Sequence, residues 1–273
     1  MNTANGPRSR RLLLINANTD PAITDRLVAA AQQIAPTNLE IVGATARFGA
    51  RYVATRAAYT IAGHAALDAY AEHSADADAV LLACFGDPGL AGLRELAPVP
   101  VIGMADAACR RAAERFQRFS IVTGGANWPS MLREFLAGLG LAQKIASIRA
   151  VDATGGQIVQ DPSREHETLV RECIAAMRED GAEAAILGGA GLVGIAEAIA
   201  RDVPIPVLDG FLEAMYAAQE AMHEPHEGGR DAPHSLQVET SGLGACLASL
   251  MSGRRRPPLA GAADPAILDD PPC

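Results

Sequence analysis

The segment DADAVLLACFGDPGLAGLRE (77–96) is repeated later in the chain as GAEAAILGGAGLVGIAEAIA (181–200). In each copy an apolar run ends in a Gly-rich turn, and a stretch with helical spacing follows. Cys84 stands where the first apolar run meets its turn, and Gly189 holds the corresponding place, 189 − 84 = 105 residues later. Because strand, turn and helix form the unit of parallel α/β sheets, the repeat predicts an α/β fold with two similar halves.

Further pairs of segments extend the repeat. LLLINANTDPAIT (12–24) resembles FSIVTGGANWPSM (119–131), and PVPVIGM (98–104) resembles PIPVLDG (204–210). We expect eight strands, at 12–16, 39–45, 79–84, 99–104, 119–125, 145–151, 184–189 and 205–210. Helices of ordinary length fit between most of them, and Thr19 or Asp20 before Pro21 suits a helix start. Two pseudo-symmetric halves, each a parallel sheet with flanking helices, are therefore expected.

The composition narrows the class of partner. The chain has 273 residues, of which 49% are apolar and 20% charged, with a formal net charge of −9. This charge argues against nucleic acid or an anionic membrane as partner, and leaves a small molecule as the expected one. No run of eighteen apolar residues occurs, and the first residues lack the apolar core of a signal peptide. Residues 1–10 and 253–273, rich in Pro, Gly and charge, are expected to be disordered tails.

Five widely spaced cysteines (Cys84, Cys109, Cys173, Cys246 and Cys273) include no CxxC pair and no Cys/His pair. Neither a metal site nor a disulfide framework is indicated, so a reducing cytoplasmic setting is expected. There is no Walker A sequence and no GxGxxG after a strand, so nucleotide chemistry has no support.

Ligands of open parallel sheets bind beyond the carboxyl ends of the strands. Two facing halves would thus enclose an active-site cleft lined by Asn16–Thr19, Cys84–Gly89, Thr123–Asn127 and Gly188–Leu192. Cys84 is the main catalytic candidate, although a buried cysteine is often only a packing residue. A place at a helix N-terminus would lower its pKa and make it a usable base or nucleophile.

Polar and glycine residues around this cleft are candidates for substrate binding. Asn16 is expected to hydrogen-bond a substrate, because it is the last residue of its strand. Asn18 needs no such role, since an Asx turn alone would account for an asparagine at that position. Thr123, Gly124 and Gly125 hold the matching place in the second half and could bind a carbonyl or carboxylate. Asp87 precedes a proline and is interpreted as a turn residue, and His64 as a structural histidine. Phe48, Phe85, Gly86, Ala190 and Gly191 complete the expected binding set.

Five segments together resemble the aspartate/glutamate/hydantoin racemase superfamily, and most of all its hydantoin and allantoin racemase branch. They are LLLINANTD, the stretch 49–68, ACFGDPGLAGLRE, VTGGANWPSML and LGGAGLVGIA, and the resemblance covers residues 11–250. It implies two α/β halves that each supply one cysteine, no cofactor, no metal and a homo-oligomer. It also implies that the chain returns to the first half at its end. The first half would then hold residues 11–113 and 212–252, and the second 114–211.

In such a family one cysteine takes the α-proton and the other delivers a proton to the opposite face. Cys84 matches the first cysteine, whereas the pattern that resembles LGCAGM reads LGGAGL here and places Gly189 at the second. A carbonyl-adjacent C–H needs only a weak base for its removal. With one thiol, however, the same face is deprotonated and reprotonated, and the centre is not inverted.

Three functions fit this pattern. The first is a racemase or epimerase of hydantoin-, allantoin- or amino-acid-derived substrates that uses water or another acid opposite Cys84. The second is a one-thiol lyase, such as a decarboxylase of the arylmalonate type. The third is a catalytically silent homologue that binds a ligand in the cleft.

Overall fold

Two four-stranded parallel sheets form the framework of the protein. The structure is a computed structural model that describes residues 9–153, 157–158, 162–223 and 238–253. The first sheet has the order β2-β1-β3-β4, and the second has the order β6-β5-β7-β8. The strands are β1 (Arg10–Asn16), β2 (Leu39–Thr45), β3 (Ala79–Leu82), β4 (Val101–Gly103), β5 (Phe119–Gly124), β6 (Ile145–Val151), β7 (Ala184–Gly188) and β8 (Val207–Asp209). The two orders are identical when four is added to each strand number, which confirms the predicted α/β class with two related halves.

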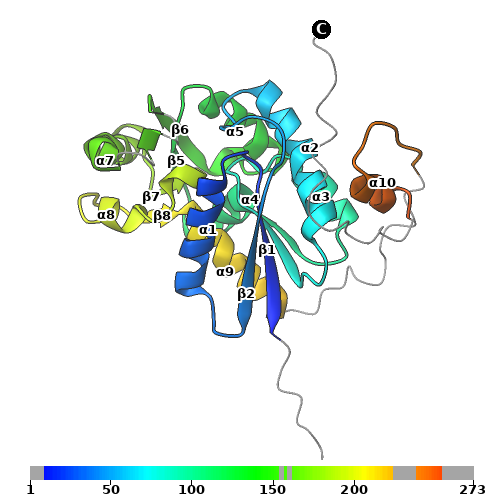
Figure 1. Ribbon diagram of the computed structural model, residues 1–273. Coiled ribbons are helices and arrows are strands. Elements are labelled where there is room, and N and C mark those ends of the chain that lie inside the picture. Colours follow the sequence, from blue (N-terminus) through cyan, green and yellow to red (C-terminus); the bar gives the residue numbers. More distant parts are fainter. Residues whose placement is uncertain (1–8, 154–156, 159–161, 224–237, 254–273) are drawn as a thin grey trace, which may run out of the picture.

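Helices cover the sheets in both halves (Figure 1). In the first half they are α1 (Pro21–Ile34), α2 (Arg56–His73), α3 (Leu90–Leu96) and α4 (Met104–Arg115). In the second half they are α5 (Trp128–Gly138), α7 (Pro162–Asp180) and α8 (Ala196–Ala200), with the short 3-10 helices η1 (Ala142–Lys144) and η2 (Ala190–Leu192). The chain continues through α9 (Gly210–His223) and α10 (Ala245–Met251).

The strands lie where the apolar runs predict them, but several end earlier. β3 stops at Leu82, because the chain turns there, and Cys84 therefore lies in the turn after the strand. Met104 and Gly210, expected as strand ends, are the first residues of α4 and α9. At the N-terminus β1 begins at Arg10, whose N–H donates to Asn38 O, so this residue belongs to the sheet and not to a tail. The other expected tail residues, apart from Ser9 and Gly253, lie outside the described ranges.

A shared apolar core joins the two halves. α4 and α9 pack against each other, and the buried rings of Phe119 and Phe211 belong to one cluster of side chains from both sheets. Arg111 and Arg115 of α4 both pair with the buried carboxylate of Glu213 on α9. Burying this large apolar surface holds the sheets in one body, so the strand ends of the two halves face a common cleft.

The segment 212–252 contacts both halves. α9 packs on β3 and β4 of the first sheet and also on β7 and β8 of the second. α10 packs on α2 of the first half, and beside it Arg47 pairs with the buried Asp68 and with Glu72. α9 is therefore a connecting helix between the halves, while α10 packs on α2 of the first half.

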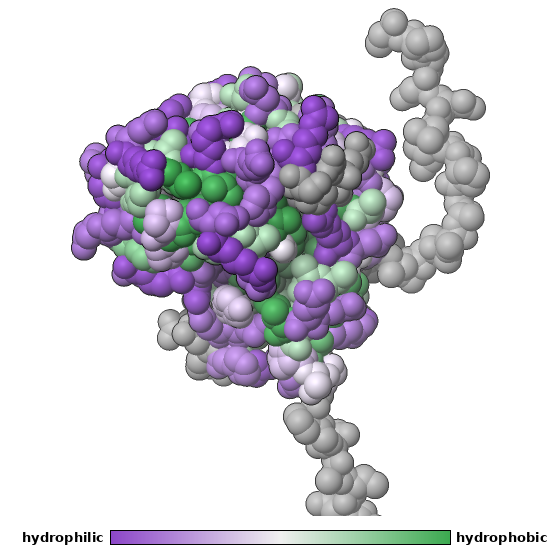
Figure 2. All heavy atoms as spheres, turned by 90° about the vertical axis from the view of Figure 1, so that its left-hand side faces the viewer, coloured by the Kyte–Doolittle hydropathy of each residue, from purple (hydrophilic) through white to green (hydrophobic). Residues whose placement is uncertain are grey.

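The face that carries α7 and α8 is mostly hydrophilic, with hydrophobic side chains scattered between charged ones (Figure 2). In the described ranges no helix is both long and apolar enough to cross a membrane.

Candidate active site

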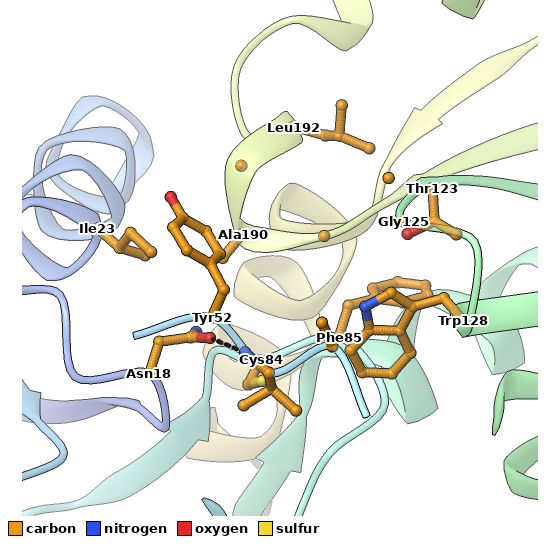
Figure 3. A pocket seen from close by; sticks show the side chains of 15 residues that line it. Asn18, Ile23, Tyr52, Cys84, Phe85, Thr123, Gly125, Trp128, Ala190 and Leu192 are labelled. Carbon is orange, nitrogen blue, oxygen red and sulfur yellow. Dashed lines mark hydrogen bonds between the residues drawn. The ribbon is translucent and has the colours of Figure 1, made fainter. Parts of the chain in front are cut away.

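A cavity lies where the two halves meet, and Cys84 lines it (Figure 3). Its volume is about 60 Å³, on the scale on which one water molecule needs roughly 10–15 Å³. This volume has room for a few water molecules. The lining residues are Asn18, Ile23, Tyr52, Val53, Ala54, Cys84, Phe85, Thr123, Gly124, Gly125, Trp128, Gly189, Ala190, Gly191 and Leu192.

The thiol of Cys84 is almost fully buried, with 3% of the residue exposed. Burial and, to a smaller extent, the negative charge of Asp87 raise its pKa to about 12. A hydrogen bond with the Asn18 side chain lowers it, but the two opposing effects are larger. The resting form at neutral pH is the protonated thiol, because a buried thiolate without a cation beside it is unfavourable.

The predicted lowering of the Cys84 pKa by a helix N-terminus is therefore wrong. α3 begins at Leu90, six residues beyond Cys84, and has Gly89 as its N-cap. The turn between them includes Gly86 and Asp87, both with positive φ. A helix dipole acts only within the first turn, so α3 does not favour the thiolate.

Gly189 occupies the same place in the second half as Cys84 in the first. The Asp87 N–H donates to Cys84 O, and the Leu192 N–H donates to Gly189 O, both at 2.9 Å. A β-carbon built on Gly189 would lie 3.8 Å from Leu192 Cδ1 and 3.9 Å from Thr123 Oγ1, so there is room for a side chain. The backbone is less permissive, because its φ of 146° belongs to a region that is essentially restricted to glycine.

The two asparagines exchange the roles that their positions suggested. Asn16 lies outside the cavity lining and is fully buried; its amide donates to Asp20 O and Thr24 Oγ1. Its Oδ1 accepts from both the backbone and the side chain of Asn18. Asn18 lines the cavity, and its Oδ1 accepts from Val53 N (Figure 3). Asn16 therefore supports Asn18, and Asp20 caps α1 through Ala22 N.

Phe85, Gly86 and Phe48 lie differently from one another. The ring of Phe85 lines the cavity and lies on the backbone of Gly188 and Gly210 in the second half. Gly86 lies outside the lining; its carbonyl accepts from Tyr59 Oη at 2.7 Å. Phe48 also lies outside the lining, with its ring edge-on to His64 at 4.9 Å between centroids.

The second half contributes small residues and backbone groups. Thr123, Gly124, Gly125, Ala190 and Gly191 all line the cavity. Thr123 is 3% exposed, and no hydrogen bond to its hydroxyl occurs within the described residues. In Figure 3 this hydroxyl points into the cavity, so it is available to a bound molecule.

Five further residues line the cavity and were not predicted from the sequence. They are Tyr52, Val53 and Ala54 from the loop before α2, Trp128 from the start of α5, and Ile23 from α1. Of these, Trp128 could have been found from the sequence, because it directly follows the Gly-rich turn that was predicted to line the cleft.

Three polar contacts join the two halves beside the cavity wall at Ala54. The Asn127 amide donates to Ala54 O at 3.0 Å, and Arg56 pairs with Glu134 and contacts Ser130. We call these contacts the mouth clasp. It joins the start of α2 to α5, and so links the two halves beside the cavity.

No group of three or more potential metal-binding side chains occurs among the described residues. The cavity lining itself carries no Lys, Arg, His, Asp or Glu side chain. Its chemistry therefore rests on one thiol, one amide, two hydroxyls, the indole N–H of Trp128 and backbone groups.

Two pseudo-symmetric α/β halves that enclose a thiol at their interface define a racemase-like class of protein. The family model for Asp/Glu/hydantoin racemases matches residues 12–218. The chain belongs to the Asp/Glu/hydantoin racemase family.

Relatives of known structure or curated name agree with this membership. The hydantoin racemase of Paenarthrobacter aurescens is 32% identical over 211 residues, 77% of this chain and 89% of the relative. The allantoin racemase of Klebsiella pneumoniae superposes with a TM-score of 0.76 at 32% identity, covering 89% of this chain and 99% of that one. The allantoin racemase of Pseudomonas fluorescens gives a TM-score of 0.75 at 32% identity, covering 80% and 96%.

Proposed function

We propose that this protein is a cofactor-independent isomerase that moves the acidic C–H proton of a hydantoin-type ring, with Cys84 acting on one face. A water molecule beside Gly189 serves the other face. Removal and return of the proton at Cys84 is then faster than inversion. Relatives named hydantoin racemase and allantoin racemase support the class of substrate.

The observation that carries the proposal is the pairing of Cys84 with Gly189 across one cavity. Both residues line it, from equivalent turns of the two halves. Proton transfer to both faces of a carbon requires a group on each side, and the side of Gly189 offers space instead of a side chain. Thr123 Oγ1, 3.9 Å from the built β-carbon, can hold a water molecule there by a hydrogen bond.

An uncharged lining favours a neutral substrate. A buried carboxylate without a cation is costly, and the lining side chains supply none. A hydantoin or allantoin ring instead presents neutral carbonyl and N–H groups. The Asn18 amide, the Thr123 hydroxyl and the backbone of Gly124 and Gly125 can pair with them. Among the three substrate types considered, the cyclic ones therefore fit better than free amino acids.

The protonation state of Cys84 sets the expected pH dependence. Since its pKa is raised to about 12, only a small fraction of the protein carries the thiolate at neutral pH. The thiolate is the base, so the exchange rate rises as the pH rises from 7 to 10.

The test compares exchange with inversion on the same substrate. Purified protein is incubated in D₂O with one enantiomer of 5-benzylhydantoin or allantoin. Loss of the C–H signal is followed by NMR, and configuration is followed by circular dichroism. Exchange that outpaces inversion supports the proposal. Inversion that accompanies every exchange event contradicts the one-thiol arrangement, and the absence of both contradicts the proposed substrate class.

A one-thiol lyase is the second candidate, and the same glycine favours it. A single thiol suffices to protonate a carbanion formed by departure of a group such as CO₂. Release of CO₂ from an arylmalonate or a 5-carboxyhydantoin, lost on exchange of Cys84 for serine, would favour this reading. A catalytically silent homologue would show ligand-dependent fluorescence of Trp128, the single tryptophan, and no turnover of either kind.

A further inference from the structure

Asp87 ties the Cys84 turn to the start of α4. Its Oδ1 accepts from Ala105 N at 3.0 Å, and its Oδ2 accepts from Asp106 N at 2.7 Å. These two N–H groups belong to the first turn of α4, which has no side-chain cap of its own because its N-cap is Gly103. Asp87 is 2% exposed, so it caps the helix from a different loop inside the core.

Gly103 leaves the space that Asp87 occupies. A β-carbon built on Gly103 would overlap the Asp87 carboxylate and the Leu90 side chain. The φ of Gly103 is −88°, a value open to any residue, so its small size and not its backbone is what matters here. In the first half, therefore, the turn after β3 supplies the carboxylate of Asp87, and the glycine at the end of β4, Gly103, leaves room for it.

The second half makes the same connection from the opposite side. Asp209, at the end of β8, caps α9 through Phe211 N at 2.9 Å. Its other oxygen accepts from Gly194 N at 2.8 Å, in the loop that follows Gly189. Under the repeat, Asp87 corresponds to Leu192 (87 + 105 = 192), and Gly103 corresponds to Asp209 (103 + 106 = 209). The capping carboxylate therefore lies in the turn in the first half (Asp87) and at the strand end in the second half (Asp209).

We propose that Asp87 is a positioning residue that holds the Cys84 turn on α4 through its bonds to Ala105 N, Asp106 N and Cys84 O, and that the reactivity of Cys84 therefore depends on the charge of this carboxylate. Asp209 fixes the Gly189 turn without acting on the thiol. The inference rests on the proposed function only in taking Cys84 as the acting thiol.

Titratable and charged groups from three helices and from the Cys84 turn face Asp87. Tyr59 of α2, Arg94 of α3, and Asp106 and Cys109 of α4 face it in addition to Cys84. Burial raises the pKa of Asp87, the two N–H groups from α4 offset part of this rise, and the resulting pKa is about 7. As the pH rises through this range, Asp87 becomes negative and raises the pKa of Cys84. For an isolated cysteine below its pKa, the thiolate fraction increases tenfold per pH unit. In this protein the thiolate fraction of Cys84 should increase less steeply near pH 7, because Asp87 becomes charged over the same range.

Alkylation of Cys84 by iodoacetamide tests this without any turnover. The reagent is neutral, so its approach does not depend on the charge of Asp87. The rate for the Cys84 peptide is measured by mass spectrometry between pH 5.5 and 9 in the wild-type protein, Asp87→Asn and Asp209→Asn. Cys246, partly exposed on α10, provides the reference rate in the same samples.

The wild-type profile is expected to rise with a slope below one around pH 7, and Asp87→Asn with a slope of one throughout. At pH 8 the Asn variant should react faster than the wild type, by about tenfold. Asp209→Asn should keep the wild-type shape. Parallel profiles for all three proteins would overturn the inference. So would a faster reaction of Asp87→Asn with an unchanged shape, since that indicates only a looser turn.

The wild-type profile keeps the test decisive by itself. If Asp87→Asn does not fold, the wild-type slope alone decides, because a uniform slope of one excludes the role of the charge. Alkylation that behaves as expected in a protein that does not act on hydantoins overturns the proposed function and leaves this inference standing. Turnover of hydantoins together with parallel alkylation profiles overturns this inference and leaves the proposed function standing.

Discussion

Phe85, the residue after the thiol, lies directly on the backbone of Gly188, the residue before Gly189. A β-carbon built on Gly188 would overlap the Phe85 ring, and one on Gly210 would lie 2.9 Å from it. The turn of one half therefore rests on the strand end of the other. The packing of the Phe85 ring against Gly188 therefore fixes the separation between Cys84 and the Gly189 side of the cavity.

Gly188→Ala should displace the Phe85 ring and destabilise the protein by about 1–3 kcal/mol, as overpacking of a core does. The φ of Gly188 is not positive, so backbone strain adds nothing. Urea unfolding and the exchange rate at the substrate C–H measure the two effects. Phe85→Leu in the same chain should recover part of the stability. Full stability in the single variant would show that the ring has another place to go.

Cys84→Ser should abolish proton exchange, with a loss of about 10²–10⁴-fold, because a hydroxyl is a far weaker acid than a thiol and its conjugate base does not form near pH 7. Cys246→Ser, changed on α10, is the matched control and should keep full activity. Circular dichroism checks that both variants fold. Persistent exchange in folded Cys84→Ser would remove this residue from the mechanism.

Gly189→Cys should raise inversion relative to exchange, since it adds a thiol on the second face in a space that admits a side chain. The backbone conformation should cost about 1–3 kcal/mol of stability. Gly189→Ala carries the same strain without the thiol and separates the two effects. A folded Cys variant with no gain in inversion over the Ala variant, on a panel of hydantoins, would indicate that the substrate class differs.

Asp87→Asn should change the pH dependence of stability. Since the pKa of Asp87 is raised from 3.8 to about 7, its contribution to folding is fully present below pH 3.8 and is lost as the pH rises through 7. Between these values the free energy of unfolding of the wild type should fall, relative to Asp87→Asn, by about 1.4 kcal/mol per pH unit. Urea unfolding at pH 4, 5.5, 7 and 8 measures the difference. A constant difference over this range would contradict the raised pKa.

Glu134→Gln should weaken the mouth clasp and speed ligand entry. The cavity has room for only a few water molecules, so a ring can bind there only if the two halves move apart beside it. An exposed ion pair contributes about 0–1 kcal/mol, so the melting temperature should hardly change. Stopped-flow fluorescence of Trp128 measures association, and Glu197→Gln, which breaks the exposed pair with Arg201, is the control. Equal association rates in both variants would place the entry route elsewhere.

Strand positions could be predicted from the sequence because parallel strands buried on both faces appear as continuous apolar runs, as AVLL in β3 does. The repeat also brought Cys84, Gly189 and Thr123 to one cleft. Tyr52 and Val53 could not be found in this way, since their loop reaches the cavity only through the tertiary fold. The bonds of Asp87 to Ala105 and Asp106 span 18 and 19 residues and have no local pattern. For the same reason Asp87 could be read only as a turn residue.

The direction of the Cys84 pKa shift could not be predicted from the sequence for a different reason. A strand–turn–helix pattern indicates that a helix follows, but not at which residue it begins. The distance from Cys84 to Leu90 decides whether the helix favours the thiolate, and that distance is a property of the turn. Burial, which sets the opposite sign, depends on elements far apart in the chain.

The exchanged carboxylates have a consequence for protein engineering by duplication. A symmetric protein built from two copies of either half would remain self-consistent, because each half keeps its aspartate and the matching small or apolar residue. A consensus of the two halves, averaged position by position, would not. It would place aspartate at both Asp87 and Gly103 or at neither, with two buried carboxylates at one helix start or an uncapped helix as the result.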